Sequence, residues 1–335
     1  MKKNNNLLIY FLSHFLFLGA GFAKISELSN TDTCISFILG TLLGIIILYL
    51  INKVSCNIPL KEYIKKKTLL NIIIKILFLG YILFNLLILF ITLSGFLYTY
   101  FLPYTPSLIS CLPFILLASY LASKNIKDIY NVAFVLIFIS LFIIIIKTLL
   151  LTNEFHFDNL LPILSVKTTS IIKASLIYAV ISTSPIFILI NENINFKSSL
   201  KYYILSSLTL ITVALTISLI LGKMINVYNY PEYTILRRIR FFKFIENIEN
   251  FICINWFFDL FIALCVFTLK IKDIFYTKSN ILPFILSFGV LYIVNTYFFN
   301  NFYNTMILFS IYPFIFAFFI VVFLLLFSIK KICGH

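Results

Sequence analysis

Apolar residues in this chain do not alternate with polar ones. They form long runs, each close to the length needed to cross a bilayer. A hydrocarbon core about 30 Å thick is crossed by roughly 20 apolar helical residues. Ten such runs stand out, with approximate limits at residues 7–25, 33–51, 69–100, 107–123, 130–151, 171–190, 202–222, 250–269, 281–298 and 306–329. The pattern predicts an all-α polytopic membrane protein with ten transmembrane helices.

Composition excludes the soluble classes. The 335 residues are 61% hydrophobic and 11% charged, and mean hydropathy is +1.06, whereas a soluble domain carries about 25% charged residues. A net charge of +14 therefore does not indicate nucleic acid here. The six cysteines lie far apart without metal-ligand spacing, so neither a metal nor another cofactor is expected. Motifs of the Walker, H-E-x-x-H and G-x-S-x-G types are also missing from the sequence, and we expect no enzyme activity.

The basic residues predict an orientation. Most of the 26 Lys and Arg fall at the two ends and in the segments after the even-numbered runs, and cytoplasmic loops collect such residues. Both termini are therefore expected in the cytoplasm. The exception is the external segment 228–250, which carries several arginines. From Ile235 to Phe251 apolar residues recur there at helical spacing, which indicates an interfacial amphipathic helix, or simply a connector lying on the membrane surface.

Two of the ten runs are interrupted. Gly19–Gly21 breaks the first run, and Ser182–Pro185 breaks the sixth. Glycine suits strained backbone, and proline removes one helical hydrogen bond. These runs begin two halves of five helices each, residues 1–151 and 160–331. Paired breaks at corresponding positions predict a permease-like fold with a five-plus-five inverted repeat and a ligand at broken helices one and six. Each break taken alone is also compatible with close helix packing or a simple kink.

Polar residues inside the other runs are few. Tyr81 and Asn85 lie four apart on one face of the third run, and Asn255 and Asp259 lie four apart on one face of the eighth. A carboxylate inside the membrane is a functional candidate, although a structural ion pair with a nearby lysine explains Asp259 equally well. The predicted ligand-binding residues are Gly19, Ala20, Gly21, Tyr81, Asn85, Ser182, Thr183, Ser184, Pro185, Asn255 and Asp259.

Other polar residues in the runs receive plainer interpretations. His14 in the first run has no second ligand near it in sequence, so we expect a packed histidine. Lys147 and Lys173 come near the outer ends of their runs. Their ammonium groups are expected to reach the interface along the apolar stem.

A block late in the chain resembles a known family. Tyr-Pro, then Arg-Arg-Ile, then Phe-Ile-Glu-Asn-Ile-Glu, then the only tryptophan follow one another as in the B subunits of endospore germinant receptors. The residues that carry the motif are Tyr230, Pro231, Arg238, Glu246, Glu249 and Trp256. Gly19–Gly44 resembles the family's first hairpin, and Leu160–Leu164 resembles its Leu-Pro-Val block. Departures at Asn247, Ala263 and Cys34 bear on the ligand more than on the fold.

The resemblance carries implications of its own. The family is similar to amino acid/polyamine/organocation permeases, which implies ten spans and the same inverted repeat. It also implies a location in the spore inner membrane, a small nutrient ligand, and a complex with an A-type membrane subunit and a C-type lipoprotein.

Three functions are compatible with the sequence. The first is a spore germination protein, a germinant-receptor subunit that binds a small germinant such as an amino acid and signals to its partners. The second is a proton-coupled amino-acid transporter that uses Asp259. The third is a structural assembly subunit with a vestigial site, which the absence of a lysine at Ala263 favours.

Overall fold

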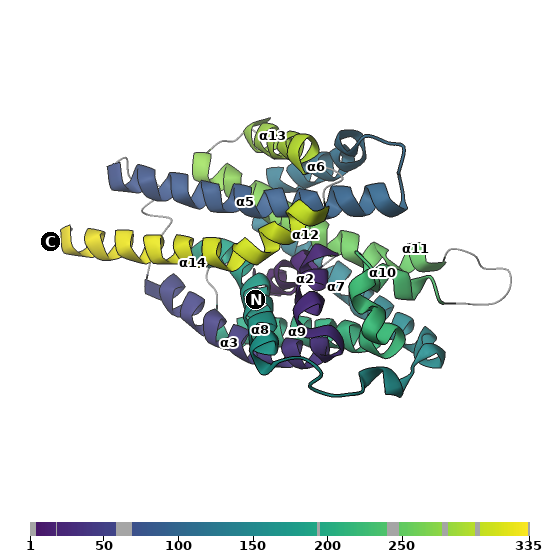
Figure 1. The fold of residues 1–335 in the computed structure, drawn as a ribbon. Coiled ribbons are helices and arrows are strands. Elements are labelled where there is room, and N and C mark those ends of the chain that lie inside the picture. The colour runs from purple at the N-terminus through teal and green to yellow at the C-terminus, as the bar shows by residue number, and fades with distance from the viewer. Residues whose placement is uncertain are drawn as a thin grey trace.

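The apolar runs fold as helices, because a backbone surrounded by lipid must satisfy its polar groups internally. The computed structural model describes residues 5–17, 19–57, 69–192, 195–239, 248–276, 281–298 and 302–333, and these ranges contain no strand. Figure 1 shows the resulting bundle, in which α5 (Leu69–Tyr100) and α14 (Phe302–Cys333) run alongside each other.

The first half of the chain contains the elements η1 Asn5–Leu7, α1 Leu8–His14, η2 Phe15–Phe17, α2 Ala20–Ser29, η3 Asn30–Asp32, α3 Thr33–Asn57, α5 Leu69–Tyr100, α6 Ser107–Ser123 and α7 Ile126–Leu150. The second half contains η4 Thr152–Glu154, η5 Phe157–Leu160, α8 Thr168–Thr183, η6 Ser184–Asn191, α9 Phe196–Leu221, η7 Gly222–Val227, α10 Pro231–Leu236, α11 Ile248–Ile252, α12 Ile254–Phe275, α13 Ile281–Tyr297 and α14 Phe302–Cys333.

Each of the ten predicted runs coincides with a helix or a pair of consecutive helices. The limits of α5 and α6 are those predicted from the sequence. Seven helical segments among the described residues are long and apolar enough to cross a membrane, by length and composition. Three shorter apolar helices, Leu8–Phe17, α6 and α13, accompany them. The protein is thus an all-helical polytopic membrane protein, while the count of ten spans stays a prediction.

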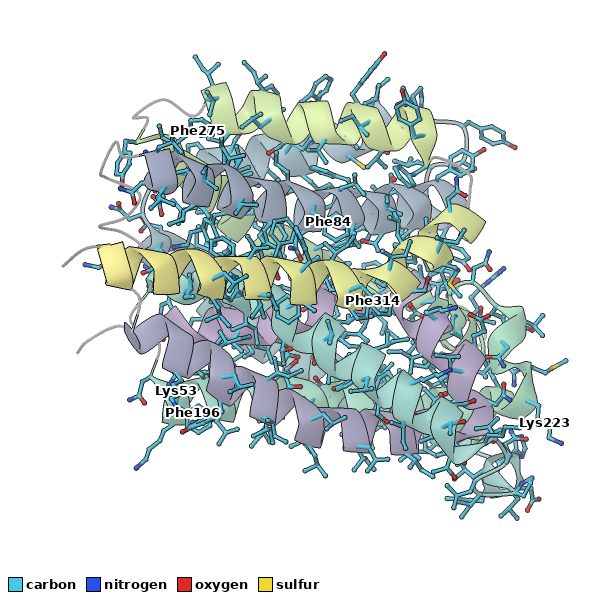
Figure 2. All side chains as sticks on the ribbon, turned by 60° about the vertical axis from the view of Figure 1, so that its left-hand side comes forward. Lys53, Phe84, Phe196, Lys223, Phe275 and Phe314 are labelled. Carbon is cyan, nitrogen blue, oxygen red and sulfur yellow. The ribbon has the colours of Figure 1, made fainter. Side chains whose placement is uncertain are left out.

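Packing places the first helix in the middle of the bundle. Every residue of α1 is buried, and α1 packs against α9 and α12. The helices α3, α8 and α9 form one side, whereas α6 and α13 lie together at the opposite edge (Figure 1). Large apolar side chains project outward, as Figure 2 shows for Phe314, which is 75% exposed. Such an apolar exterior is expected where helices contact lipid.

The first helix is broken as predicted, but at a slightly different place. α1 ends at His14, a 3₁₀ turn follows, and Gly19 adopts φ of 64° immediately before α2. A Cβ atom added to Gly19 would lie 2.3 Å from the ring of Tyr230. The helix resumes at Ala20, so Ala20 and Gly21 belong to its first turn. The expectation that residues 19–21 are all unwound is therefore wrong beyond Gly19.

The sixth run changes helix type rather than unwinding. α8 ends at Thr183 and continues as the 3₁₀ helix η6, with Pro185 near its start. Near the end of α8, Ser182 Oγ and Thr183 Oγ1 donate to the carbonyl oxygen of Ala179 at 3.1 Å and 2.6 Å.

The external segment differs from the prediction. α10 begins at Pro231, where a proline suits the first helical turn, and ends at Leu236. Arg237 to Ile239 are not helical, so the expected amphipathic helix from Ile235 to Phe251 is wrong over this part. The apolar residues Ile235, Leu236 and Ile239 are buried among the helices rather than against a membrane surface. Residues 240–247, with Glu246 of the family motif, lie outside the described residues.

Candidate ligand-binding site

A small cavity lies beside the broken first helix. Its volume is about 40 Å³, which admits a few water molecules or a small organic group. Seven helices (α1, α2, α3, α7, α9, α10 and α12) and the turn η2 contribute polar and apolar side chains to its wall. The residues that line it are His14, Phe15, Phe17, Phe22, Phe37, Ile144, Lys147, Leu210, Val213, Glu232, Asn255, Trp256 and Asp259.

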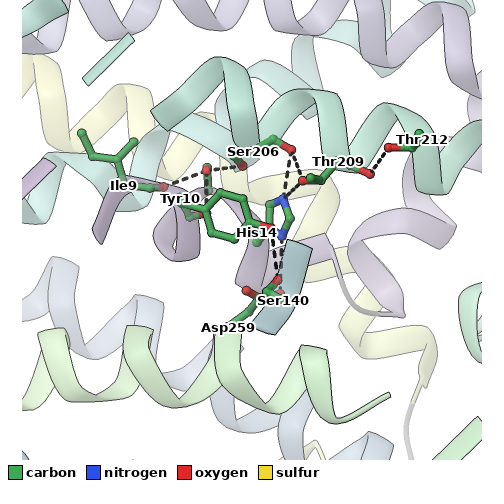
Figure 3. A network of polar contacts seen from close by, with 9 residues as sticks. Ile9, Tyr10, His14, Ser140, Ser206, Thr209, Thr212 and Asp259 are labelled. Carbon is green, nitrogen blue, oxygen red and sulfur yellow. Dashed lines mark hydrogen bonds and ion pairs between the residues drawn. The ribbon is translucent and has the colours of Figure 1, made fainter. Parts of the chain in front are cut away.

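His14 joins α1 to α9 and α12, as Figure 3 shows. Its Nε2 lies 2.9 Å from the carbonyl oxygen of Ser206 and 2.7 Å from Thr209 Oγ1. A carbonyl oxygen can only accept, so Nε2 carries a hydrogen. Nδ1 faces Asp259 Oδ2 at 3.4 Å. His14 and Asp259 thus form a contact between two buried side chains.

Neighbouring hydroxyl groups hold the histidine in place. Ser13 Oγ lies 2.5 Å from Ser206 Oγ, and the Tyr10 hydroxyl lies 3.2 Å from Ser140 Oγ of α7. The ring of Tyr10 also packs on that of His14, with centroids 4.5 Å apart. Since every one of these contacts is buried, they fix the position of α1 against α7 and α9.

Glu232 connects α10 to the break in the first helix. Its Oε1 accepts a hydrogen bond from the backbone amide of Gly19, the N-cap residue of α2. The N-terminus of a helix attracts a carboxylate because its amide groups point outward and unpaired. Glu232 is 4% exposed. Burial raises its pKa to about 7, against the opposing effects of the Gly19 amide and the charge of Lys147.

The family-motif residues gather around this contact. Tyr230 packs on Gly19, and its ring centroid lies 5.5 Å from that of Phe96. The ring centroid of Trp256 lies 5.2 Å from that of the same Phe96. Tyr230 and Pro231 thereby set the position of Glu232 over the broken helix. Arg238 and Glu249 are half-buried and do not line the cavity.

A second polar cluster surrounds the break in the sixth helix. The Tyr81 hydroxyl donates to the carbonyl oxygen of Ser184 at 2.6 Å. The Tyr312 hydroxyl of α14 donates to Asn85 Oδ1 at 2.8 Å and also contacts Ser184 Oγ. Asn85 Nδ2 donates to the Tyr81 carbonyl at 2.9 Å. The polar atoms of this cluster are paired with one another, so they stabilise the start of η6.

The predicted site residues therefore separate into two places. Asn255 and Asp259 line the cavity, and Gly19 touches it through Glu232. Tyr81, Asn85 and Ser184 form the second cluster. Of the remaining residues, Ser182 contacts the Tyr203 hydroxyl at 2.9 Å, and Ala20, Gly21, Thr183 and Pro185 do not line the cavity. A ligand-binding role for any of these residues stays a prediction.

Three cavity residues were not expected from the sequence: His14 as a partner of Asp259, Lys147 and Glu232. The expectation that Lys147 reaches the interface is wrong, because its side chain is buried at 5% exposure. The buried residues of α7 recur every three or four positions and include Ser140, Ile144 and Lys147. That periodicity is visible in the sequence and places Lys147 on the inner face. Lys173, by contrast, is exposed as expected.

Several polar atoms at the cavity are unpaired within the described part of the chain. Glu232 Oε2, Asn255 Oδ1 and Asp259 Oδ1 are buried and have no hydrogen-bond partner there. For the Lys147 ammonium, likewise, no hydrogen bond or ion pair is found among the described residues. Buried polar groups are nearly always paired. These atoms are therefore candidates for contact with water or a ligand.

A cavity with polar groups beside an interrupted membrane helix is the arrangement expected of a permease-like site. A family model described as "Spore germination protein", the spore permeases, matches residues 6–303. The chain belongs to this family of spore germination permeases, the family of germinant-receptor B subunits, which confirms the resemblance. No match was found among curated proteins. The family is of a permease or receptor type rather than an enzyme class, and its role is in spore germination.

Proposed function

We propose that this protein is the B-type subunit of a nutrient germinant receptor, which binds a small germinant, an amino acid in the first instance, inside a permease-like fold. The observation that carries the proposal is the cavity: its unpaired polar atoms lie beside the broken first helix of a protein whose family acts in spore germination. Buried polar atoms without a hydrogen-bond partner cost free energy inside a membrane bundle unless a ligand or water binds them.

The proposed architecture is ten spans in two inverted halves, residues 1–151 and 160–331. Helix contacts support it. In an inverted repeat the equivalent helices near the pseudo-two-fold axis pack on each other. Here α1 contacts α8, α3 contacts α9, α5 contacts α12 and α6 contacts α13. These are the first, second, third and fourth spans of the two halves.

Signalling requires that the ligand favour one conformation over another by a few kcal/mol. The contact between Glu232 and Gly19 offers a route, because it joins α10 in the external segment 228–250 to the half-helix α2. A ligand that enters the cavity meets Glu232 directly. The external segment would carry the change to a partner.

The remaining parts of the proposal concern place and partners. Both termini lie in the cytoplasm, the membrane is the spore inner membrane, and the partners are an A-type membrane subunit and a C-type lipoprotein. Support comes from the family and from the lysine-rich segments between helices. The test is affinity purification of the tagged protein from native spore membranes with mass spectrometry. Recovery of a larger membrane subunit and a lipoprotein is expected; a solitary protein abundant in growing cells would contradict the receptor.

One observation favours a second candidate, a proton-coupled amino-acid transporter. His14 Nδ1 and Asp259 Oδ2 lie 3.4 Å apart and both side chains are buried, an arrangement that could carry a proton through the membrane interior. In proteoliposomes a transporter would accumulate labelled amino acid only with a pH gradient, and Asp259→Asn would abolish that uptake. Uptake that is absent with the wild-type protein, together with ligand binding that persists, would leave the receptor as the function.

A further inference from the structure

The anion position at the broken first helix is already occupied. In a permease-like site, the N-terminus of a half-helix is where a ligand carboxylate binds. Here the Gly19 amide donates to Glu232 Oε1 instead. Glu232 is 4% exposed and held by an element that packs against the bundle. A carboxylate-bearing ligand in this cavity must therefore use a different cation or donor.

Lys147 is a cationic residue that lines the cavity. It projects from α7, its side chain is buried, and the described residues offer it neither a hydrogen bond nor an ion pair. An ammonium group buried in a membrane bundle requires an anionic or polar partner. A ligand carboxylate in the cavity would supply one.

The unpaired oxygen atoms match the opposite end of such a ligand. Glu232 Oε2, Asn255 Oδ1 and Asp259 Oδ1 all belong to residues that line the cavity. Three acceptors are the complement of an ammonium group, which has three N–H donors and no acceptor. Trp256 borders the same space and offers a ring face to a cation.

The charge balance favours a ligand that adds no net charge. The cavity places a basic residue with each acidic one, His14 with Asp259 and Lys147 with Glu232. A free anion or a free cation would leave an uncompensated charge in the bundle, which costs several kcal/mol. A zwitterion leaves the balance unchanged. The cavity volume of about 40 Å³ favours small members of that class.

We propose that Lys147 binds the carboxylate of a small zwitterionic amino acid, whose ammonium group is bound by Glu232, Asn255 and Asp259. This inference rests on the proposed function, because it uses the same cavity and names its ligand class and the residue that selects it. In this proposal Lys147 selects for a carboxylate. The N-terminus of α2 does not have that role, because Glu232 already accepts the hydrogen bond of the Gly19 amide.

The test is ligand titration of the purified full-length protein in lipid nanodiscs. Trp256 is the only tryptophan, so its fluorescence reports on the cavity. The probes are glycine and its two halves, methylammonium and acetate. Glycine is expected to give a saturable change. Lys147→Met should weaken glycine binding on the order of tenfold or more and should not weaken methylammonium binding, because the variant removes a positive charge from the cavity. Lys173→Met, an exposed lysine in α8, is the matched control.

The outcomes separate the inference from the proposed function. Lys147→Arg retains the charge and should keep glycine binding, which guards against misreading a poorly folded Met variant. If Lys147→Met binds glycine as tightly as the wild type while Asp259→Asn does not, the cavity binds the ligand and the role of Lys147 is overturned. If glycine gives no response but a larger amino acid does, the preference for small amino acids is overturned. No response to any amino acid, in nanodiscs or in the purified receptor complex, overturns both proposals.

Discussion

Glu232 accepts a hydrogen bond from the backbone amide of Gly19, a residue 213 positions earlier in the chain. A side chain of the protein itself therefore bonds the free backbone amide at the break in the first helix. It also ties an external segment to the centre of the bundle, because α10 packs against α9 while its glutamate reaches the N-terminus of α2. The proposed signalling route runs through this contact.

Gly19→Ala should destabilise the protein strongly. The backbone has φ of 64° there, and the added Cβ would lie 2.3 Å from the Tyr230 ring. A strained residue costs about 1–3 kcal/mol before the clash is counted. Gly289→Ala is the control, because no atom lies within 4 Å of its Cβ position and alanine favours the helix. Thermal unfolding in detergent should show a lower midpoint for Gly19→Ala only; equal midpoints would contradict the close packing.

The stability of the wild-type protein should fall as pH rises from about 4.5 to about 7. Burial raises the Glu232 pKa from 4.5 to about 7, so between these values the folded state holds a proton that the unfolded chain has lost. The folded state then binds more protons, and stability decreases with pH, by up to about 3 kcal/mol. Glu232→Gln should flatten this slope in thermal unfolding measured across that range.

The control for that experiment is Glu27→Gln, because the Glu27 side chain is 55% exposed and pairs with Lys24 at the surface. Lys147, Tyr100 and Tyr230 also interact electrostatically with Glu232. These groups are unchanged in both variants, so a difference in slope isolates Glu232. Identical slopes for wild type and Glu232→Gln would show that Glu232 does not carry the proton.

His14→Ala should cost about 3 kcal/mol of stability, because it leaves Asp259 buried without the partner at 3.4 Å. Asp259→Asn alone should cost less, since an amide carries no charge. In the double variant the losses should not add, with a coupling of about 1–3 kcal/mol. Thermal unfolding of the four proteins gives this cycle, and His156→Ala, an exposed loop histidine, is the control. Additive losses would show that the two side chains do not interact.

The sequence predicts the helices well, because lipid imposes one simple rule on them. An apolar run of about 20 residues has few alternatives to a helix, and α5 and α6 have the limits that their runs predicted. The two breaks are visible for a similar reason, since glycine and proline act locally. The end of α10 at Leu236 is not visible, because it depends on burial of Ile239 by distant helices.

The site is less predictable, because it is assembled by contacts across the bundle. Helical spacing places Asn255 and Asp259 on one face, but no spacing relates Asp259 to His14, which lies in the first span. Glu232 belongs to a charged external segment, and its burial follows from how Tyr230 and Pro231 turn the chain inward. Lys147 could have been found from the buried stripe of α7, and only its place near the end of the apolar run suggested otherwise.

Tyr312→Phe tests whether the two polar clusters have different roles. The hydroxyl group of Tyr312 bonds Asn85 at 2.8 Å and contacts Ser184, so its loss leaves buried groups unpaired and should cost about 1–3 kcal/mol. Glycine affinity, read from Trp256 fluorescence, should stay within about twofold of the wild type, because the second cluster does not line the cavity. Asp259→Asn is the counterpart, with the larger effect expected on affinity. If Tyr312→Phe lowers the affinity as much as Asp259→Asn does, the two breaks act as one site, as the paired interruptions in the sequence first indicated.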